Sequence, residues 1–149
     1  MNTRGFTLVE LMAAMAVAGL LAVLVAPTLL SYARTSALQA VTRELATAIN
    51  LGRQMAITQN TTVCVEAGGT KIRLRRGGCG GAVWTGPGTD AGGAIRISEP
   101  GTFLVSTTAN VMFSELGAAS PAGTYTVTNP VNGATRAVVV AATGRISVR

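Results

Sequence analysis

The sequence predicts an α+β fold, in which one long N-terminal α-helix packs against antiparallel β-sheets. Two observations support this class. The first is a stretch of 23 residues without a charge, Leu11–Ala33, after which a helical repeat of apolar and small residues continues to about Thr58. The second is the texture from Gln59 onward, where short alternating runs rich in Val, Thr and Ile are separated by turns that contain glycine.

The composition limits the classes of function that the chain can have. It has 149 residues, of which 12% are charged and 48% hydrophobic, and its mean hydropathy of +0.44 is typical of a small domain joined to a membrane segment. The absence of histidine excludes Ser-His and Cys-His catalysis and His-ligated metal sites. The carboxylates are scattered and no phosphate-binding glycine loop is present. We therefore expect no enzymatic activity, no metal and no cofactor.

The uncharged stretch Leu11–Ala33 is long enough to cross a membrane, since a helix of this length reaches roughly 34 Å and a hydrocarbon core is about 30 Å thick. Arg4 gives the preceding segment a positive charge, which favours a cytoplasmic N-terminus and places the remainder beyond the membrane. Pro27 is expected to bend the helix, because it removes one backbone hydrogen bond.

Glu10 is the charged exception within the apolar run that begins at Phe6. A carboxylate inside a membrane costs a few kcal/mol unless it finds a partner. One interpretation is that its side chain lies at the membrane edge and reaches water. A second interpretation follows from the motif around it, which is described below.

Beyond Pro27 the helix is expected to continue to about Thr58, for a total length of roughly 80 Å. Its second half carries one stripe of apolar and small residues that is mostly free of charge, and the small side chains predict close packing against the sheets. The stripe comprises Leu30, Ala33, Ala37, Val41, Leu45, Ala48, Gly52 and Met55.

Eight strands are expected after the helix, because short alternating runs recur about every ten residues between turn signals such as Asn132-Gly133. Trp84 lies among glycines between two of these runs; it is either an exposed contact for a partner or packed onto the sheet. The expected strands are Thr61–Glu66, Thr70–Arg76, Ala94–Ser98, Thr102–Ser106, Val111–Ser114, Thr124–Thr128, Ala137–Ala141 and Arg145–Val148.

Cys64 and Cys79 flank the first expected hairpin. Outside the cytoplasm a disulfide between them would close a loop of about 15 residues, which is worth up to about 3 kcal/mol. The alternative is two separate buried thiols. A redox function is not expected, since a Cys-x-x-Cys spacing is absent.

Two groups of basic residues are candidates for binding an anion, and the chain from Gln59 onward carries a net charge of +4. On an alternating strand Lys71, Arg73 and Arg75 share one face, with a spacing that suits the phosphates of a nucleic acid. The alternative is the solvated face of an edge strand, where charge discourages aggregation. Arg145 and Arg149 form the second group and would share a face of the last strand.

The string from Gly5 to Met12, Gly-Phe-Thr-Leu-Val-Glu-Leu-Met, resembles the class III signal of type IV prepilins and type II secretion pseudopilins. The short leader, the Gly-Phe junction, the spacing of the glutamate and the apolar run all coincide. The resemblance implies cleavage after Gly5 by a prepilin peptidase, N-methylation of Phe6, and pairing of Glu10 with the N-terminal amine of a neighbouring subunit. An ordinary secretory signal is rejected, because its small-residue cleavage sites would lie inside the apolar run, between Ala14 and Ala18.

The rest of the chain resembles the GspH/FimT-type minor pilins. The similarity lies in Val63-Cys64 after the long helix, in Cys79, in Trp84 followed by Gly86, and in the closing segment Ala141–Val148 with its Gly-Arg pair. The resemblance implies a pilin-like fold with four parts. These are a prepilin leader at 1–5, a hydrophobic transmembrane and assembly helix at 6–33, an amphipathic continuation at 34–58, and a periplasmic β domain at 59–149.

The resemblance also implies a structural function, as a minor pseudopilin of a type II secretion pseudopilus or a minor pilin of a type IV pilus. Such a subunit is held in the inner membrane by a single span, with its N-terminus in the cytoplasm and its C-terminal domain in the periplasm, and then enters a filament. The implied partners are the prepilin peptidase, other pilins or pseudopilins, and the inner-membrane assembly platform.

The alternative within the same resemblance is a FimT-like minor pilin that binds DNA during natural transformation. Some of those proteins use a C-terminal Gly-Arg-x-Arg motif, of which this chain has Gly144-Arg145 but carries Ser147 in place of the second arginine. Arg149 follows two residues later. A membrane-anchored hydrolase is a third class, and it has only scattered carboxylates and serines in its favour.

Overall fold

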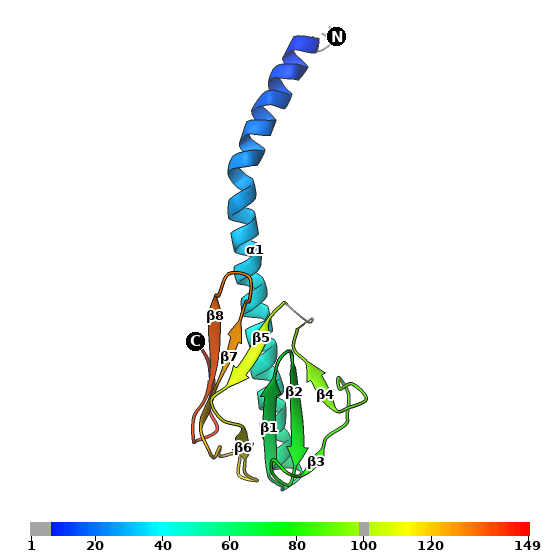
Figure 1. The fold of residues 1–149 in the computed structure, drawn as a ribbon, viewed down its shortest axis with the longest axis vertical. Helices are drawn as coiled ribbons and strands as arrows, with labels where there is room; N and C mark the ends of the chain where they lie inside the picture. The colour runs from blue at the N-terminus through cyan, green and yellow to red at the C-terminus, as the bar shows by residue number, and fades with distance from the viewer. Residues whose placement is uncertain (1–6, 99–101) are drawn as a thin grey trace, which may run out of the picture. The chain divides into compact units, whose positions relative to one another are not determined.

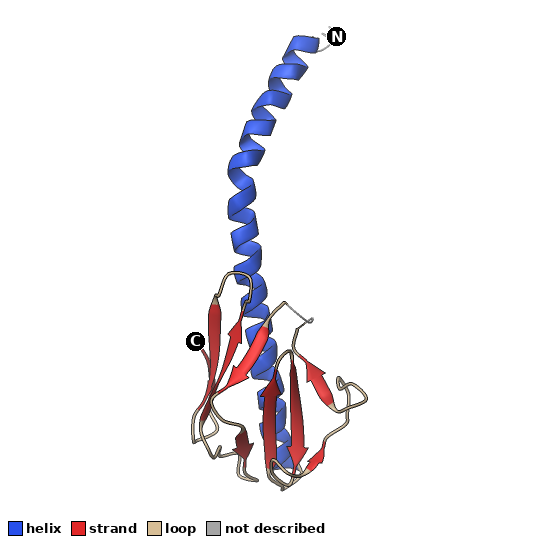
Figure 2. Ribbon diagram, viewed as in Figure 1, coloured by secondary structure: helices blue, strands red, loops and turns tan. Residues whose placement is uncertain are grey.

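A computed structural model describes residues 7–98 and 102–149 of the chain, apart from the side chains of residues 24–27. One helix is followed by short strands (Figures 1 and 2). The chain divides into two compact units, Met1–Ser36 and Ala37–Arg149, and the helix contributes to both. The elements are α1 Leu8–Thr58, β1 Val63–Gly68, β2 Lys71–Arg76, β3 Ala82–Val83, β4 Ala94–Arg96, β5 Leu104–Thr107, β6 Val111–Phe113, β7 Gly123–Thr128, β8 Thr135–Val140 and β9 Ile146–Val148.

Side-chain and backbone caps define both ends of α1. At the start, the Thr7 hydroxyl accepts a hydrogen bond from the Glu10 N–H at 3.3 Å, which makes Thr7 the N-cap residue. At the end, Asn60 has a positive φ of 47°, and Thr61 N–H donates to Ala56 C=O at 3.1 Å while Asn60 N–H donates to Ile57 C=O at 3.4 Å. This pair of bonds is a Schellman motif with Asn60 at the left-handed position, and it ends the helix at Thr58, as predicted.

The strands form two antiparallel sheets in the second unit. The first sheet has the order β3-β2-β1-β6, with β4 pairing β2 beside β3, and the second has the order β5-β7-β8-β9. Each of the eight expected strands has its counterpart, which confirms the α+β class. The two-residue strand β3 was not predicted, because Ala82–Val83 is too short to show an alternation.

Hydrogen bonds join the two sheets at Gly69 and at Tyr125. Val105 of β5 donates its N–H to Gly69 C=O, at the turn between β1 and β2, at 2.6 Å. The Tyr125 hydroxyl, on β7 of the other sheet, donates to Val65 C=O at 2.9 Å and accepts from Val111 N–H at 3.1 Å. Tyr125 is fully buried, so its oxygen links β7 to β1 and β6 across the core.

The second half of α1 packs against these sheets, and Figure 1 shows β1 and β2 in front of it. Leu45, Ala48, Gly52 and Met55 of the predicted stripe are buried. A side chain at Gly52 would meet Val65 Cγ2 at 3.0 Å and Leu74 Cδ2 at 3.1 Å, so this glycine permits the close helix-to-sheet contact that the small residues predicted.

For the N-terminal part of this stripe, the prediction of which residues are buried is wrong. Leu30, Ala33 and Ala37 are exposed and Val41 is only partly buried, whereas Leu38 and Thr42 occupy the buried positions. Hydrophobic periodicity passed over Thr42 because it is polar. Its hydroxyl donates to Leu38 C=O at 2.7 Å, and that bond allows it to be buried.

Candidate functional site

The N-terminal unit contains the first candidate residues. Gly5 and Phe6, the expected cleavage and methylation positions, lie outside the described residues. Glu10 is described and exposed, and its carboxylate accepts a hydrogen bond from the Thr7 hydroxyl, with 3.4 Å between Thr7 Oγ1 and Glu10 Oε2. With the bond from Glu10 N–H to the same hydroxyl, this geometry is close to a capping box, Thr-x-x-Glu.

Thr7 is a residue that the sequence analysis missed, although the Thr-x-x-Glu spacing was visible. The capping geometry gives Glu10 a local role at the start of α1. The described partner of this exposed carboxylate is a neutral hydroxyl. The anionic group therefore stays available for a cation.

An apolar surface follows Glu10 along α1. Leu11, Met12, Met15, Leu20, Leu21 and Leu29 are among the large hydrophobic side chains that the chain leaves exposed. Among the described residues α1 is the helix that is long and apolar enough to cross a membrane. The helix continues through position 27, and the bend expected at Pro27 stays a prediction.

Cys64 and Cys79 are joined by a disulfide, with 4.9 Å between their Cα atoms. This resolves the alternative of two separate thiols. Cys64 is buried on β1, whereas Cys79 lies exposed in the turn after β2, so the bond ties this turn to the core of the first sheet.

The basic face of β2 is largely neutralised by neighbouring carboxylates. Lys71, Arg73 and Arg75 share the side of the strand opposite the buried Ile72 and Leu74, as predicted. Lys71 Nζ lies 2.7 Å from Asp90 Oδ2, and Arg75 Nε lies 2.8 Å from Glu66 Oε2. Arg73 has no ion pair among the described residues.

The alternative interpretation placed these residues on the solvated face of an edge strand. That is wrong in one respect, because β2 is not an edge strand. β2 lies inside its sheet, with β1 on one side and β3 and β4 on the other. Its neighbours also explain the ion pairs. Asp90 comes from the loop between β3 and β4, and Glu66 comes from β1.

Asp90 organises the loop between β3 and β4. Its Oδ1 accepts hydrogen bonds from Gly92 N–H and Ala94 N–H, both at 2.9 Å, while Oδ2 faces Lys71. The hydrogen bond from Lys71, together with these backbone donors, lowers the pKa of the Asp90 carboxyl to about 2. The Asp90 carboxylate thus links this loop to Lys71 of β2.

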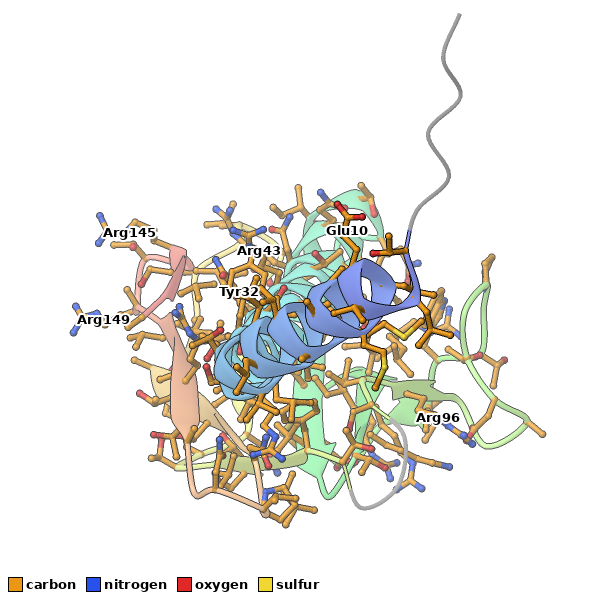
Figure 3. The ribbon with its side chains drawn as sticks, turned by 90° about the horizontal axis from the view of Figure 1, so that it is seen from above. Glu10, Tyr32, Arg43, Arg96, Arg145 and Arg149 are labelled. Carbon is orange, nitrogen blue, oxygen red and sulfur yellow. A yellow bond between two sulfur atoms is a disulfide. The ribbon has the colours of Figure 1, made fainter. Side chains whose placement is uncertain are left out.

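Arg145 and Arg149 share one face, as predicted. Pairing with β8 aligns Ser147 with Val139 and Ile146 with Val140, and Arg149 exchanges backbone hydrogen bonds with Ala137. Both arginines therefore lie on the side of the sheet opposite its core. Both are exposed and point outward from the same side of the unit (Figure 3). They lie on the second sheet, so the structure does not bring them together with Lys71, Arg73 and Arg75 on the first.

Gly144, which precedes Arg145, is held against the rest of the unit. It has a φ of +78°, and a side chain there would collide with the carbonyl oxygen of Gly117. Arg53 of α1 donates its Nε–H to this same Gly117 carbonyl at 3.0 Å. Arg53 is thus a second residue that the sequence analysis missed, because its partner lies 64 residues away.

Trp84 packs inward, which decides between its two interpretations. It is partly buried against the hydrophobic core, and a side chain at Gly86 would overlap its ring. The residues 7–98 and 102–149 contain no group of three or more carboxylate or cysteine side chains that could hold a metal ion.

Models of known protein families match parts of the sequence. Residues 41–144 match the family model of the type II transport protein GspH, and residues 1–26 match the prokaryotic N-terminal methylation motif. No curated protein matches the sequence.

Three solved structures have a similar fold. The type IV minor pilin FimU of Pseudomonas aeruginosa has a TM-score of 0.60 and 16% identity, over 79% of this chain and 92% of that one. GspH of E. coli has a TM-score of 0.58 and 14% identity, over 78% of this chain and 89% of that one. The minor pseudopilin EpsH of Vibrio cholerae has a TM-score of 0.57 and 7% identity, over 75% and 95%. At these identities the likeness concerns the fold.

Proposed function

This chain belongs to the GspH family of type II transport proteins, and we propose that it is a structural filament subunit whose Glu10 sets its position among neighbouring subunits. The chain is a minor pilin or pseudopilin of a type II secretion system or a type IV pilus. Proposed beyond this are cleavage after Gly5 by a prepilin peptidase, N-methylation of Phe6, and assembly into a periplasmic filament that serves protein secretion.

The proposal includes a location for each part. Before assembly, the helix from Phe6 to Ala33 spans the inner membrane, with the N-terminus in the cytoplasm and the β domain in the periplasm. The assembly platform then transfers this helix from lipid into a filament core of similar helices. The exposed apolar side chains of this segment suit both surroundings, since each is apolar.

The single observation that carries the proposal is the exposed carboxylate of Glu10 at the start of an apolar helix. Its local partner is a neutral hydroxyl, so its charge is not compensated within the described chain. The proposed processing would leave a cationic amine on Phe6 of a neighbouring subunit, which could pair with Glu10. Pairing the two ions shares a desolvation cost that each would otherwise bear alone.

The substitution Glu10→Gln tests this role without removing the helix cap, because glutamine is also accepted at the third position of a capping box. We expect the variant to enter the membrane normally and to be reduced at least tenfold in isolated filaments. Glu115→Gln, which removes an exposed carboxylate from the β domain, is the matched control and should assemble as the unmodified chain does. Normal assembly of Glu10→Gln would restrict Glu10 to capping and defeat the proposed role.

The second candidate function is DNA binding by a FimT-like minor pilin. It is favoured by the exposed pair Arg145 and Arg149 on one face at the edge of the second sheet. Binding of duplex DNA by the full chain in non-ionic detergent should weaken with rising salt and be lost in Arg145→Ala/Arg149→Ala. Arg43→Ala/Arg76→Ala removes two exposed arginines that lie outside both candidate groups and is the control. No binding at low salt would remove this candidate.

A further inference from the structure

β9 is a sheet edge that the described part of the chain leaves without a neighbour. Among the residues that the structure describes, no bridge and no backbone hydrogen bond outside the ladder with β8 involves Ile146 or Val148. An uncovered edge of this kind can pair with a further strand. The other edge strands of three or more residues differ, because each has a bridge on its outer side; these bridges pair Val105 of β5 with Gly69, Ile95 of β4 with Thr89, and Phe113 of β6 with Ala119.

The register shows which backbone groups of β9 face away from β8. Arg149 exchanges both backbone hydrogen bonds with Ala137 of β8. Because the backbone groups of an antiparallel strand alternate in direction, the N–H and C=O of Ile146 and of Val148 point to the open side. The edge therefore presents alternating donors and acceptors to a neighbouring backbone.

The two sides of this edge differ in chemistry. On the core side Ile146 is partly buried and Val148 is 40% exposed, so apolar surface borders the edge. A hollow of about 440 Å³, lined by Ile146 and by Ala46 of α1 among others, leaves room beside it. On the outer side Arg145 and Arg149 are exposed, point outward (Figure 3) and make no ion pair among the described residues. A strand that suits both sides is apolar on its inner face and acidic on its outer face.

We infer that β9 accepts an extended segment of a partner protein as an added antiparallel strand. Backbone hydrogen bonds to Ile146 and Val148 hold the segment, as in other cases of strand addition. Its apolar side chains lie opposite these two residues, and its carboxylates lie opposite Arg145 and Arg149. The inference goes beyond the filament function and does not depend on it.

A second copy of this chain suits the same edge poorly. If two β9 strands paired about Ser147, Arg145 of each strand would lie opposite Arg149 of the other. Like charges at directly opposed positions are destabilising. The two arginines therefore discourage pairing of β9 with itself and favour an acidic segment.

DNA matches this edge less well than a peptide does. Its phosphates accept hydrogen bonds from arginine, but they donate none to the outward carbonyl oxygens of Ile146 and Val148. A peptide backbone supplies a donor and an acceptor at each of these positions. The backbone groups of β9 thus distinguish the two kinds of partner, although both are attracted by Arg145 and Arg149.

A peptide probe tests the inference with the full chain in non-ionic detergent. The probe is the capped, fluorescein-labelled peptide Asp-Val-Thr-Val-Asp, whose valines lie opposite Ile146 and Val148 in the added strand. We expect its fluorescence anisotropy to show saturable binding. N-methylation of both valines removes the N–H groups that face β9 and should weaken binding by about tenfold or more. N-methylation of the threonine, whose N–H faces away, should change binding by less than about twofold.

Substitutions in the chain provide the matching test. Val148→Pro removes an outward N–H without removing a bond to β8, and proline is tolerated at such edge positions. We expect this variant to bind the probe about tenfold more weakly, whereas Val148→Ala, which keeps the N–H, should lose less than about threefold. Arg145→Ala/Arg149→Ala should weaken binding by about fivefold or more. The control Arg43→Ala/Arg76→Ala should bind as the unmodified chain does.

Each outcome supports or overturns the inference. It is overturned if the probe does not bind at chain concentrations up to about 1 mM, or if the two N-methylated peptides bind equally well. Unchanged binding in a folded Val148→Pro variant also overturns it, and the emission of Trp84 reports whether each variant is folded. If duplex DNA binds through Arg145 and Arg149 while the probe does not, the edge serves a nucleic acid instead. Dimers that Val148→Pro abolishes, without binding of the probe, would assign the edge to a second copy.

Discussion

Replacing Tyr125 by phenylalanine removes one oxygen atom that joins the two sheets. In the native chain this hydroxyl accepts from Val111 N–H and donates to Val65 C=O, and the side chain is fully buried. The substitution leaves a buried N–H without this acceptor, at a cost of about 1–3 kcal/mol, and loses a second bond worth about 1 kcal/mol. We therefore expect Tyr125→Phe to lower the free energy of unfolding by about 2–4 kcal/mol.

Urea unfolding of the full chain in non-ionic detergent, followed by the fluorescence of the single tryptophan, Trp84, measures this loss. With a slope of about 2 kcal/mol per molar urea, the midpoint should fall by about 1–2 M. The other tyrosine provides the control, because Tyr32 is 74% exposed on α1 and Tyr32→Phe should change the free energy by less than about 0.5 kcal/mol. A Tyr125→Phe midpoint equal to that of the control would refute the role of the hydroxyl.

The same residue has a pH signature. Burial raises the pKa of the Tyr125 hydroxyl from 10.0 to about 12, so the unfolded chain loses this proton at lower pH than the folded chain does. The contribution to stability is complete below pH 10 and is lost as the pH rises from 10 towards 12. Tyr125→Phe should lack this part of the alkaline decline, and an identical decline in both proteins would contradict the assignment.

Two further predictions concern the first sheet. Reduction of the Cys64–Cys79 bond, or substitution of both cysteines by alanine, should lower the free energy of unfolding by up to about 3 kcal/mol. The same urea unfolding assay, with and without reductant, measures this loss. Equal midpoints would contradict the structure. The Asp90–Lys71 pair should stabilise the chain above about pH 4 and lose its effect as the pH falls towards 2, because the pKa of Asp90 is lowered in the folded state. Thermal unfolding of Asp90→Asn should therefore differ from that of the native chain at pH 7 and converge with it near pH 2, and a constant difference would argue against the ion pair.

Local patterns in the sequence were enough to predict where the helix and most of the strands lie. The alternation of β2 placed Ile72 and Leu74 inside, and the turn signals separated the strands correctly. The helix ended where predicted because the chain changes character at Gln59, and Asn60 supplies the left-handed residue there. The two-residue strand β3 carried no such pattern.

Long-range pairings were not predictable in the same way. Lys71 pairs with Asp90, Arg53 with Gly117, and Tyr125 with Val65, and these partners are separated by 19, 64 and 60 residues. Which residues meet depends on strand order and on how α1 packs, and a sequence period does not encode either. The cap formed by Thr7 is the opposite case, since its partner Glu10 lies three residues away and the spacing was visible.

The most direct test of the central claim, that the chain is a processed filament subunit, is mass spectrometry of its N-terminal peptide after recovery from isolated filaments. The account predicts that the chain is present there, that residues 1–5 are absent, and that the terminus is N-methylated Phe6. A chain found in membranes with Met1 retained and missing from filaments, or one cleaved between Ala14 and Ala18, would contradict it.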